Sequence, residues 1–250
     1  RILMFAAFAV LFYRNLRYRR YLVGYKRGKY NFTDILSLNK MGWMVGLQMG
    51  LETALFSITG IMIGWLGSIA LAAHQVMVAI STLGFMIYYG VGAAVSVRVS
   101  NYFGRQELLH VRRTTMAGFH LILCLAVCAC TVFLFSRELI GYLFTTSEEV
   151  IRVVSTLVYI LLAYQFGDAL QITYANSLRG IGDVISMAVI SFIGYFLIAM
   201  PVCYICGFVL EWGITGIWIG YPIGLTLTGV MLCGRYYWKL KTKTQSKEFY

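Results

Sequence analysis

Long apolar stretches separated by short polar segments dominate the chain. Residues 53–97 contain no Lys, Arg, Asp or Glu, and the same is true of 114–136, 184–210 and 212–234. A helix needs about 20 predominantly apolar residues to cross a bilayer, whereas a transmembrane strand needs about 9–11 with alternating polarity. The lengths of these stretches therefore favour membrane-spanning helices over strands.

From this pattern we predict an all-α integral membrane protein with six full transmembrane helices. They cover residues 41–64, 71–97, 114–136, 152–178, 185–209 and 214–237. An earlier apolar run, residues 2–13, is too short to cross the membrane by itself. We expect residues 1–13 to be the end of a truncated transmembrane helix, so that the chain is a fragment without its N-terminal part.

Composition supports the membrane class. Hydrophobic residues make up 60% of the chain and charged residues 12%, against about 45–50% and about 25% in soluble domains. This hydrophobicity excludes a disordered chain, and six cysteines in 250 residues are too few for a secreted disulfide scaffold. The net charge of +11 is spread between apolar stretches and not along one soluble face, so we expect no nucleic-acid partner.

The basic residues fall on every second connection between the predicted spans. Segments 14–40 and 98–113, the turn at Arg179 and the residues after 234 together hold 18 of the 21 Lys and Arg. Because basic loops stay in the cytoplasm, we predict a multi-pass protein of the plasma (inner) membrane. Its loop 14–40 and its tail 238–250, including the C-terminus, should then be cytoplasmic.

Two acidic residues lie inside apolar spans. Glu52 is 12 residues beyond Lys40 and Asp168 is 11 residues before Arg179, so both lie roughly 17–18 Å from the cytoplasmic edge. A carboxylate at this depth costs about 2.5–3.5 kcal/mol, and secondary transporters bind coupling ions near the midplane. Since neither acid has a nearby base in its own helix, we predict that the two bind a coupling Na⁺ or proton. A structural hydrogen bond between helices is the alternative.

Polar side chains accompany both acids at helical spacing. Gln48 stands four residues before Glu52, Tyr164 stands four before Asp168, and Gln171 follows Asp168 by three. Residues three or four apart share a helix face, so this pattern favours helices that line an aqueous cavity.

Other residues give weaker signals. His74 begins the second full span and is interpreted as an interfacial hydrogen-bonding residue, and spacing alone assigns no role to Gln75. The pair Cys203 and Cys206 lies in an apolar span, where cysteine behaves as a small hydrophobic residue. Because the chain contains no phosphate-binding loop, zinc-protease motif or nucleophile elbow, we predict neither an enzyme nor a cofactor.

Glycines recur every fourth residue in the first and last full spans, at Gly42, Gly46 and Gly50 and at Gly216, Gly220 and Gly224. Such stripes let helix backbones approach closely in lipid, and we interpret both as packing surfaces. Pro201 and Pro222 lie within spans and can kink them.

Several stretches together resemble the C-terminal half of the multidrug and toxic compound extrusion (MATE) family of cation-coupled antiporters. They fall within about residues 37–240 and comprise Gly50–Phe56, Leu71–Gln75, Gly92–Val99, Tyr164–Gln171 and Ser177–Gly180. The resemblance implies twelve helices in two six-helix lobes around a central cavity. This chain would supply the end of helix six and helices seven to twelve, with 14–40 as the loop between the lobes and 41–237 as the C-terminal lobe.

The resemblance also implies roles for individual residues. Glu52 corresponds to the membrane carboxylate of helix seven, Asp168 to the acid of helix ten, and Tyr164 to a tyrosine beside it in cation binding. The residues expected to contact substrate are Gln75, Gln48, Gln171 and Phe85.

Two positions depart from the pattern of some relatives. Tyr88 stands where some have proline, and Phe85 stands where some have a tyrosine that contacts the coupling cation through its ring. The ring face of Phe85 can still attract a cation, although it lacks the hydroxyl group.

The activity implied by the resemblance is multidrug efflux by antiport. A cationic amphipathic compound would leave as Na⁺ or H⁺ enters, and the expected partners are such compounds, the lipid bilayer and the missing N-terminal lobe. The alternative is a flippase for lipid-linked oligosaccharides, whose phosphates would need Arg or Lys within the membrane. The mid-membrane charges predicted here are acids, which suit cationic cargo. A structural or channel protein is a third hypothesis, in which neutral substitution of Glu52 leaves any transport intact.

Overall fold

The computed structural model describes residues 2–14 and 31–248, and every regular element in these ranges is a helix. The chain divides into two units, 1–40 and 41–250. In the first unit, α1 (Ile2–Arg14) is an apolar helix of 13 residues with none buried. Residues 15–30, most of the predicted basic loop, lie outside the described residues, so the prediction of a loop there stays a prediction.

Six long helical segments correspond to the six predicted spans, and each is long and apolar enough to cross a membrane. They are α3 (Phe32–Gly64), α4 (Ser68–Gly104), α5 (Leu108–Phe135), α7 (Glu148–Gly180), the segment Val184–Val209, and α10 (Gly213–Glu248). A short helix, α6 (Arg137–Phe144), precedes α7 in a segment that we predicted to be a loop.

Several helices extend beyond their predicted bounds: α4 reaches Gly104, past the predicted end at 97, and α5 begins at Leu108, before the predicted start at 114. α3 begins at Phe32, nine residues before the predicted start at 41, and α10 continues to Glu248 through most of the predicted tail. Hydropathy marks the part of a helix that lies in hydrocarbon, whereas the helix itself ends where its backbone bonding ends. The polar extension of α10 is rich in Lys, which has good helix propensity.

The segment Val184–Val209 is interrupted by π-helical turns. α8 (Val184–Phe192) leads into η2 (Ile193–Ala199), α9 (Met200–Tyr204) and η3 (Ile205–Val209), with Pro201 in the first turn of α9. Proline has no N–H to donate and disturbs the bonding of the preceding turn, and π turns are common at functional sites. Here η2 carries Tyr195, which is fully buried. Pro222, in contrast, lies within the continuous helix α10.

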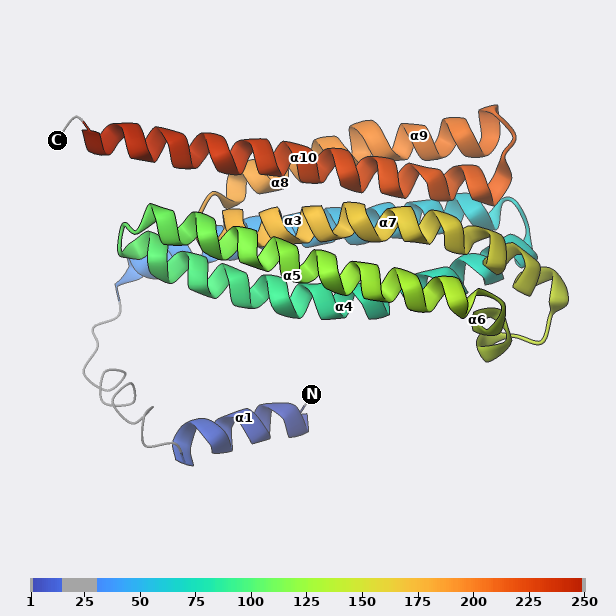
Figure 1. Ribbon diagram of the computed structural model, residues 1–250, viewed down its shortest axis with the longest axis horizontal. Coiled ribbons are helices and arrows are strands. Elements are labelled where there is room, and N and C mark those ends of the chain that lie inside the picture. Colours follow the sequence, from blue (N-terminus) through green and yellow to red (C-terminus); the bar gives the residue numbers. More distant parts are fainter. Residues whose placement is uncertain (1, 15–30, 249–250) are drawn as a thin grey trace. The chain divides into compact units, whose positions relative to one another are not determined.

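α7 is the central helix of the second unit. It packs against α10 on one side and against α4 and α5 on the other (Figure 1). Its approach to α10 is close at Gly167, where a Cβ atom would lie 2.8 Å from Thr226 Oγ1. Of its 33 residues 19 are buried, whereas α3, which also has 33 residues, buries five. The helix of Asp168 is therefore enclosed, and the helix of Glu52 is largely exposed.

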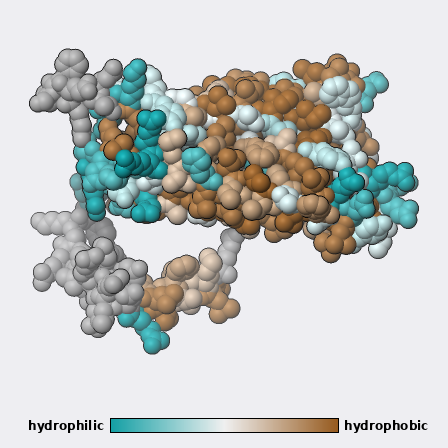
Figure 2. All heavy atoms as spheres, viewed as in Figure 1, coloured by the Kyte–Doolittle hydropathy of each residue, from teal (hydrophilic) through white to brown (hydrophobic). Residues whose placement is uncertain are grey.

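The surface of the second unit is apolar over the middle of the helices. Figure 2 shows hydrophobic residues along this middle region and hydrophilic residues toward both ends. Large exposed side chains include Leu83, Met86, Val132 and Leu197, each at least 59% exposed. Contiguous apolar surface marks an interaction surface, and here it lies on helices that are long and apolar enough to cross a membrane.

The two glycine stripes differ. Cβ atoms at Gly216, Gly220 or Gly224 would press against Cys206, Cys203 or Ala199, so this stripe of α10 packs closely on the preceding span, as predicted. A Cβ atom at Gly42, Gly46 or Gly50 would meet no atom within 4 Å in the described part of the chain. The packing interpretation of the α3 stripe is therefore wrong for the described residues.

Candidate cation and substrate site

Three side-chain donors converge on one carboxylate oxygen of Glu52. Gln48 Nε2 donates to Glu52 Oε2 at 3.2 Å, Tyr195 Oη at 3.4 Å, and Gln171 Nε2 at 3.5 Å. Gln171 Nε2 also donates to Tyr195 Oη at 2.5 Å. The donors come from α3, α7 and η2, so the carboxylate of the exposed helix α3 is tied to two other spans.

Asp168 is in the opposite situation. Its side chain is 0% exposed, and neither carboxylate oxygen has a hydrogen-bond partner among the described residues. On α7 it lies on the face that carries Tyr164, which lines a pocket with Glu52, and Gln171, which donates to Glu52. A buried charge without a partner is costly, and a bound proton or cation would offset this cost.

Further unpaired polar atoms lie around Asp168. Both amide atoms of Gln165 and the hydroxyl of Tyr88 are buried without a hydrogen-bond partner in the described residues. The Gln165 amide lies against Gly84 of α4, where a Cβ atom would be 3.0 Å from Nε2. Native proteins satisfy most buried polar groups, so these unpaired groups on α7 and α4 are unusual.

A pocket of about 270 Å³ opens beside Glu52, between α3, α4 and α7. It is lined by Met49, Glu52, Thr53, Phe56, Val78, Ser81, Thr82, Phe85 and Tyr164. A mostly apolar wall with three aromatic rings, a few hydroxyl groups and one acid suits an amphipathic cation. A smaller space of about 20 Å³ adjoins this pocket. Its lining includes Gln48 and Gln171, the two glutamines that bond to Glu52, together with Tyr89 and Arg179. It has room for about one water-sized particle.

The structure gathers most of the predicted site residues in one place. Glu52, Tyr164 and Phe85 line the larger pocket, and Gln48 and Gln171 bond to Glu52. Gln75 is exposed and does not line that pocket. It lies three residues before Val78 and seven before Thr82, and therefore shares their face of α4, about 15 Å from Phe85. Its role in substrate contact stays a prediction.

Sequence reasoning missed two residues of the site. Tyr195 lies in an apolar span without any charge, and only its position in η2 brings its hydroxyl to Glu52. Arg179 was assigned to a cytoplasmic turn, yet it reaches inward to Gln48. Arg179 is not in the helix of Glu52 and is 11 residues from Asp168, so it does not contradict the prediction that neither acid has a nearby base in its own helix. It does bring a base from α7 to Gln48, which in turn donates to Glu52. An arginine one turn beyond Asn176 on the polar face of α7 was the available signal.

His74 lies inside the bundle and not at an interface. It is 2% exposed, and its ring packs edge-on against Trp218 at 5.8 Å between ring centres. Its Nδ1 has no hydrogen-bond partner in the described part of the chain. The interpretation as an interfacial residue is therefore wrong, because helix α10 covers this face of α4.

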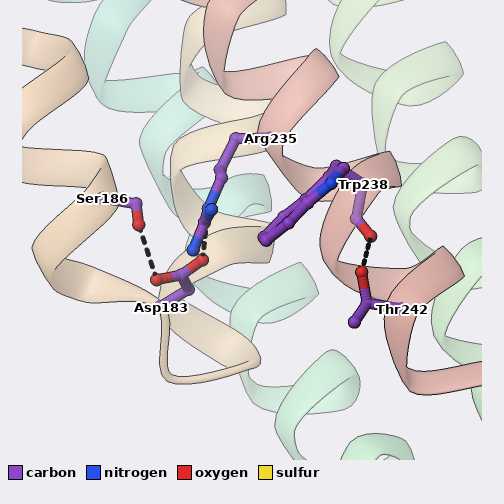
Figure 3. A network of polar contacts seen from close by, with 5 residues as sticks. All are labelled: Asp183, Ser186, Arg235, Trp238 and Thr242. Atoms are coloured by element: carbon purple, nitrogen blue, oxygen red, sulfur yellow. Dashed lines mark hydrogen bonds and ion pairs between the residues drawn. The ribbon is translucent and has the colours of Figure 1, made fainter. Parts of the chain in front are cut away.

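A third acid, Asp183, shows what a paired carboxylate looks like in this fold. It lies in the turn between α7 and α8, where Gly182 takes a positive φ of 79°. Arg235 Nε donates to Asp183 Oδ2 at 2.7 Å, and Ser186 Oγ donates to Oδ1 at 2.8 Å (Figure 3). Burial raises the pKa of Asp183, but the hydrogen bonds from Arg235 and Ser186 outweigh it and hold the pKa below its usual value.

The same cluster continues along α10. The Arg235 guanidinium lies over the ring of Trp238, with 4.5 Å between Cζ and the ring centre. The carbonyl of Trp238 accepts a hydrogen bond from Thr242 at 3.0 Å (Figure 3). The edge of the guanidinium group thus bonds to Asp183 and one of its faces packs on Trp238, which fixes this part of α10 to the turn after α7.

The cysteines supply no such site in the described residues. All six are free, and no group of three or more His, Cys, Asp or Glu there is arranged to hold a metal ion. Cys203 is buried against the glycine stripe of α10, which agrees with its interpretation as a small hydrophobic residue.

Comparison with known proteins places these features in context. Residues 45–205 match the family model described as MatE. The chain is similar to multidrug resistance protein NorM of Photobacterium profundum, with 34% identity over 220 residues that cover 86% of this chain and 47% of that protein. It is also similar to NorM of Vibrio cholerae, with 32% identity over 214 residues that cover 83% and 47%. The chain thus spans about half the length of the curated relatives it matches.

The fold is shared with solved structures of membrane transporters. The eukaryotic MATE transporter AtDTX14 superposes with a TM-score of 0.78 at 20% identity, covering 88% of this chain and 51% of that one. A MATE protein in complex with MaL6 gives a TM-score of 0.80 at 14% identity, covering 87% and 49%. The six-helix arrangement described above is therefore that of about half of such a structure.

Proposed function

The chain belongs to the MatE family, and on this premise we propose that it is the C-terminal, cation-coupling half of a multidrug efflux transporter. The observation that carries the proposal is the pair of membrane acids in one site. Asp168 is buried without a partner, and Glu52 faces a pocket large enough for an organic group. The similarity to proteins named multidrug resistance protein NorM supports export as the direction of transport.

In the proposed cycle, a Na⁺ or H⁺ that enters from outside binds between Glu52 and Asp168. Binding neutralises the charge of Asp168 and weakens the hold of Glu52 on its donors Gln48, Gln171 and Tyr195. Since these donors belong to α3, α7 and η2, cation binding changes how α3 is held against the bundle. The cation therefore has a different affinity for the two arrangements of α3, which is the condition for coupling.

The proposed cargo is a cationic amphipathic compound. Its apolar body would lie against Phe56, Phe85 and Tyr164, and its positive charge near Glu52. Cargo and coupling cation would then compete for one carboxylate, so that arrival of the cation favours release of the cargo. A monovalent cation that moves inward gains about 2.3 kcal/mol per 100 mV of membrane potential, which can drive export against a gradient.

We also propose the orientation indicated by the basic connections. The segments 98–113 and 14–40, the turn at Arg179 and the end of α10 would lie in the cytoplasm, and the membrane would be the plasma (inner) membrane. Cysteine labelling at position 104 in a variant without native cysteines tests this. Labelling from outside the cell would contradict the orientation.

Arg179 gives partial support to the flippase hypothesis, because the phosphates of a lipid-linked cargo would need an Arg or Lys within the membrane. It is the one base that lines the two pockets beside Glu52 in the described residues. Its guanidinium group, however, already donates to Tyr89, Asn176 and Gln48. An anionic cargo would have to displace these bonds and approach Glu52, and a cationic cargo therefore remains the better fit.

The test uses proteoliposomes that contain this chain together with its proposed N-terminal lobe. Efflux of an ethidium-type dye is measured under a Na⁺ gradient and, separately, under a pH gradient. Acceleration by either gradient supports antiport and identifies the ion. Dye movement that is indifferent to both gradients would overturn the proposal.

A further inference from the structure

We propose that Arg179 is a positioning residue that sets the affinity of the membrane site for its coupling cation, acting on Glu52 through the side chain of Gln48. The proposal rests on the cation-coupled function proposed above and adds a regulator of that site. Arg179 itself contacts neither acid as an ion pair in the described residues. It acts on Glu52 through the side-chain amide group of Gln48.

The geometry of the bridge is specific. Arg179 Nη2 donates to Gln48 Oε1 at 3.3 Å, and Gln48 Nε2 donates to Glu52 Oε2 at 3.2 Å. A positive charge at the amide oxygen draws electron density from the amide nitrogen and makes it a stronger donor to the carboxylate. The ionised form of Glu52 is thereby favoured while no cation is bound.

The guanidinium group is held in this position from three helices. Nη1 donates to Tyr89 Oη of α4 at 3.4 Å and to Asn176 Oδ1 of α7 at 3.3 Å. Gln48 supplies the contact from α3. An arginine that only stabilised the end of α7 would point toward the lipid headgroups, whereas this one is directed into the space of about 20 Å³ that it shares with Glu52.

The charge balance at Glu52 follows from the groups that face it. Those that bond to it or line the adjoining spaces are Gln48 on α3, Tyr195 on η2, Phe85 and Tyr89 on α4, and Tyr164, Gln171 and Arg179 on α7. Asp168 lies on the face of α7 that carries Tyr164 and Gln171. Only Asp168 and Arg179 among them carry a charge, and their effects on an arriving cation are opposite. Asp168 attracts the cation and Arg179 repels it.

This balance explains how a site with two acids can release its cation. Two carboxylates in a low-dielectric site would bind a cation tightly, and transport requires that it also leave on the cytoplasmic side. A resident positive charge lowers the affinity to a range in which both uptake and release are possible. It also takes over the stabilisation of Glu52 once the cation has left.

The experiment uses the purified 250-residue chain in lipid nanodiscs. Difference infrared spectra report the carboxyl groups as Na⁺ is added at fixed pH and as protons are added without Na⁺. We expect Arg179→Gln to lower the half-saturating cation concentration by roughly threefold to tenfold, where tenfold corresponds to about 1.4 kcal/mol. Arg179→Lys keeps the charge and should stay close to the original protein, and Arg98→Gln, an exposed position of α4, should have no effect.

A second variant separates the bridge from the charge. Gln48→Met breaks the amide link and leaves Arg179 in place, so we expect a smaller shift in the same direction. This variant also decides the matter if Arg179→Gln does not fold, as judged by circular dichroism. An unchanged or raised half-saturating concentration in the folded variants would overturn the role of Arg179. Absence of any cation-dependent carboxyl signal in the original chain would instead contradict the proposed function.

Discussion

Two aspartates 15 residues apart, Asp168 within α7 and Asp183 just after it, have opposite surroundings. Asp183 receives a hydrogen bond from Arg235 at 2.7 Å and another from Ser186 at 2.8 Å. Asp168 is completely buried and has no hydrogen-bond partner in the described residues. The first carboxylate is satisfied by the fold itself, and the second is left for something that the fold does not supply.

This is the difference that we expect between a structural acid and one that binds a coupling cation. A buried or half-buried carboxylate that serves stability comes with its own donors, because an unpaired charge costs several kcal/mol. A site that must take up and release a cation cannot be filled permanently by a side chain. Glu52 lies between the two extremes, since it has neutral donors but no base within ion-pair distance in the described part of the chain.

The largest expected effect is a difference in cation affinity between variants of the two aspartates. In the purified chain, Asp168→Asn should weaken binding of the coupling cation at least about tenfold, because one of two charged ligands is lost. Asp183→Asn should leave it unchanged. Equilibrium binding of labelled Na⁺, or proton uptake where Na⁺ does not bind, measures both. Equal losses of cation affinity in the two variants would contradict this difference between the two aspartates.

Protein stability should respond in the opposite order, with the larger loss in the Asp183 variant. Asp183→Asn removes a charge-assisted pair and should lower the free energy of unfolding by about 1–3 kcal/mol. Asp168→Asn removes an unpaired buried charge and should leave stability unchanged or raise it by about 1 kcal/mol. Unfolding in detergent with increasing dodecyl sulfate measures both values. A larger loss for Asp168→Asn would mean that this residue has a structural partner.

Low pH should abolish the contribution of Asp183 to the stability of the folded protein. Its pKa is lower in the folded protein than the unfolded value of about 3.9. Its contribution is therefore complete above about pH 5 and is lost as the pH falls through the folded pKa. The stability difference between the original chain and Asp183→Asn should stay constant from about pH 8 to about pH 5 and shrink below about pH 4. A difference that grows in acid would contradict the assigned pairing.

The smallest effect is expected at Tyr195. Tyr195→Phe removes one of three donors to Glu52 and keeps the ring in the core, so the change in cation affinity should be about twofold to tenfold. Tyr221→Phe, whose hydroxyl bonds to Thr59 away from both acids, is a matched control. An equal effect of the two substitutions would show that Tyr195 acts through packing.

Much of the fold follows from the sequence alone. The apolar stretches predict six spans because hydrocarbon demands continuous apolar surface, and the same demand makes Glu52 and Asp168 conspicuous. Helix ends in water are not subject to it, which explains why the start of α3 and the end of α10 were misplaced. The stripe of Gly42, Gly46 and Gly50 was misinterpreted because spacing shows that a partner could approach, and not that one does.

The two acids of the site could be predicted from the sequence, whereas Tyr195 and Arg179 could not. Tyr195 is indistinguishable in sequence from the other tyrosines of apolar spans, and the hydropathy pattern does not predict the π-helical turn that places it. Arg179 fitted a cytoplasmic turn by charge, yet its long side chain folds back along α7 to Gln48. Depth along a helix is predictable from residue counting, and side-chain direction at a helix end is not.

The central claim is that Glu52 and Asp168 couple export to cation entry, and dye efflux tests it most directly. Efflux driven by an ion gradient is compared for Glu52→Gln, Asp168→Asn and Asp183→Asn, normalised to folded protein in the membrane. Glu138→Gln and Glu211→Gln serve as controls for the loss of a negative charge elsewhere. We expect the first two variants to lose the acceleration by the gradient and the other three to keep it. Wild-type rates in both Glu52→Gln and Asp168→Asn would contradict it.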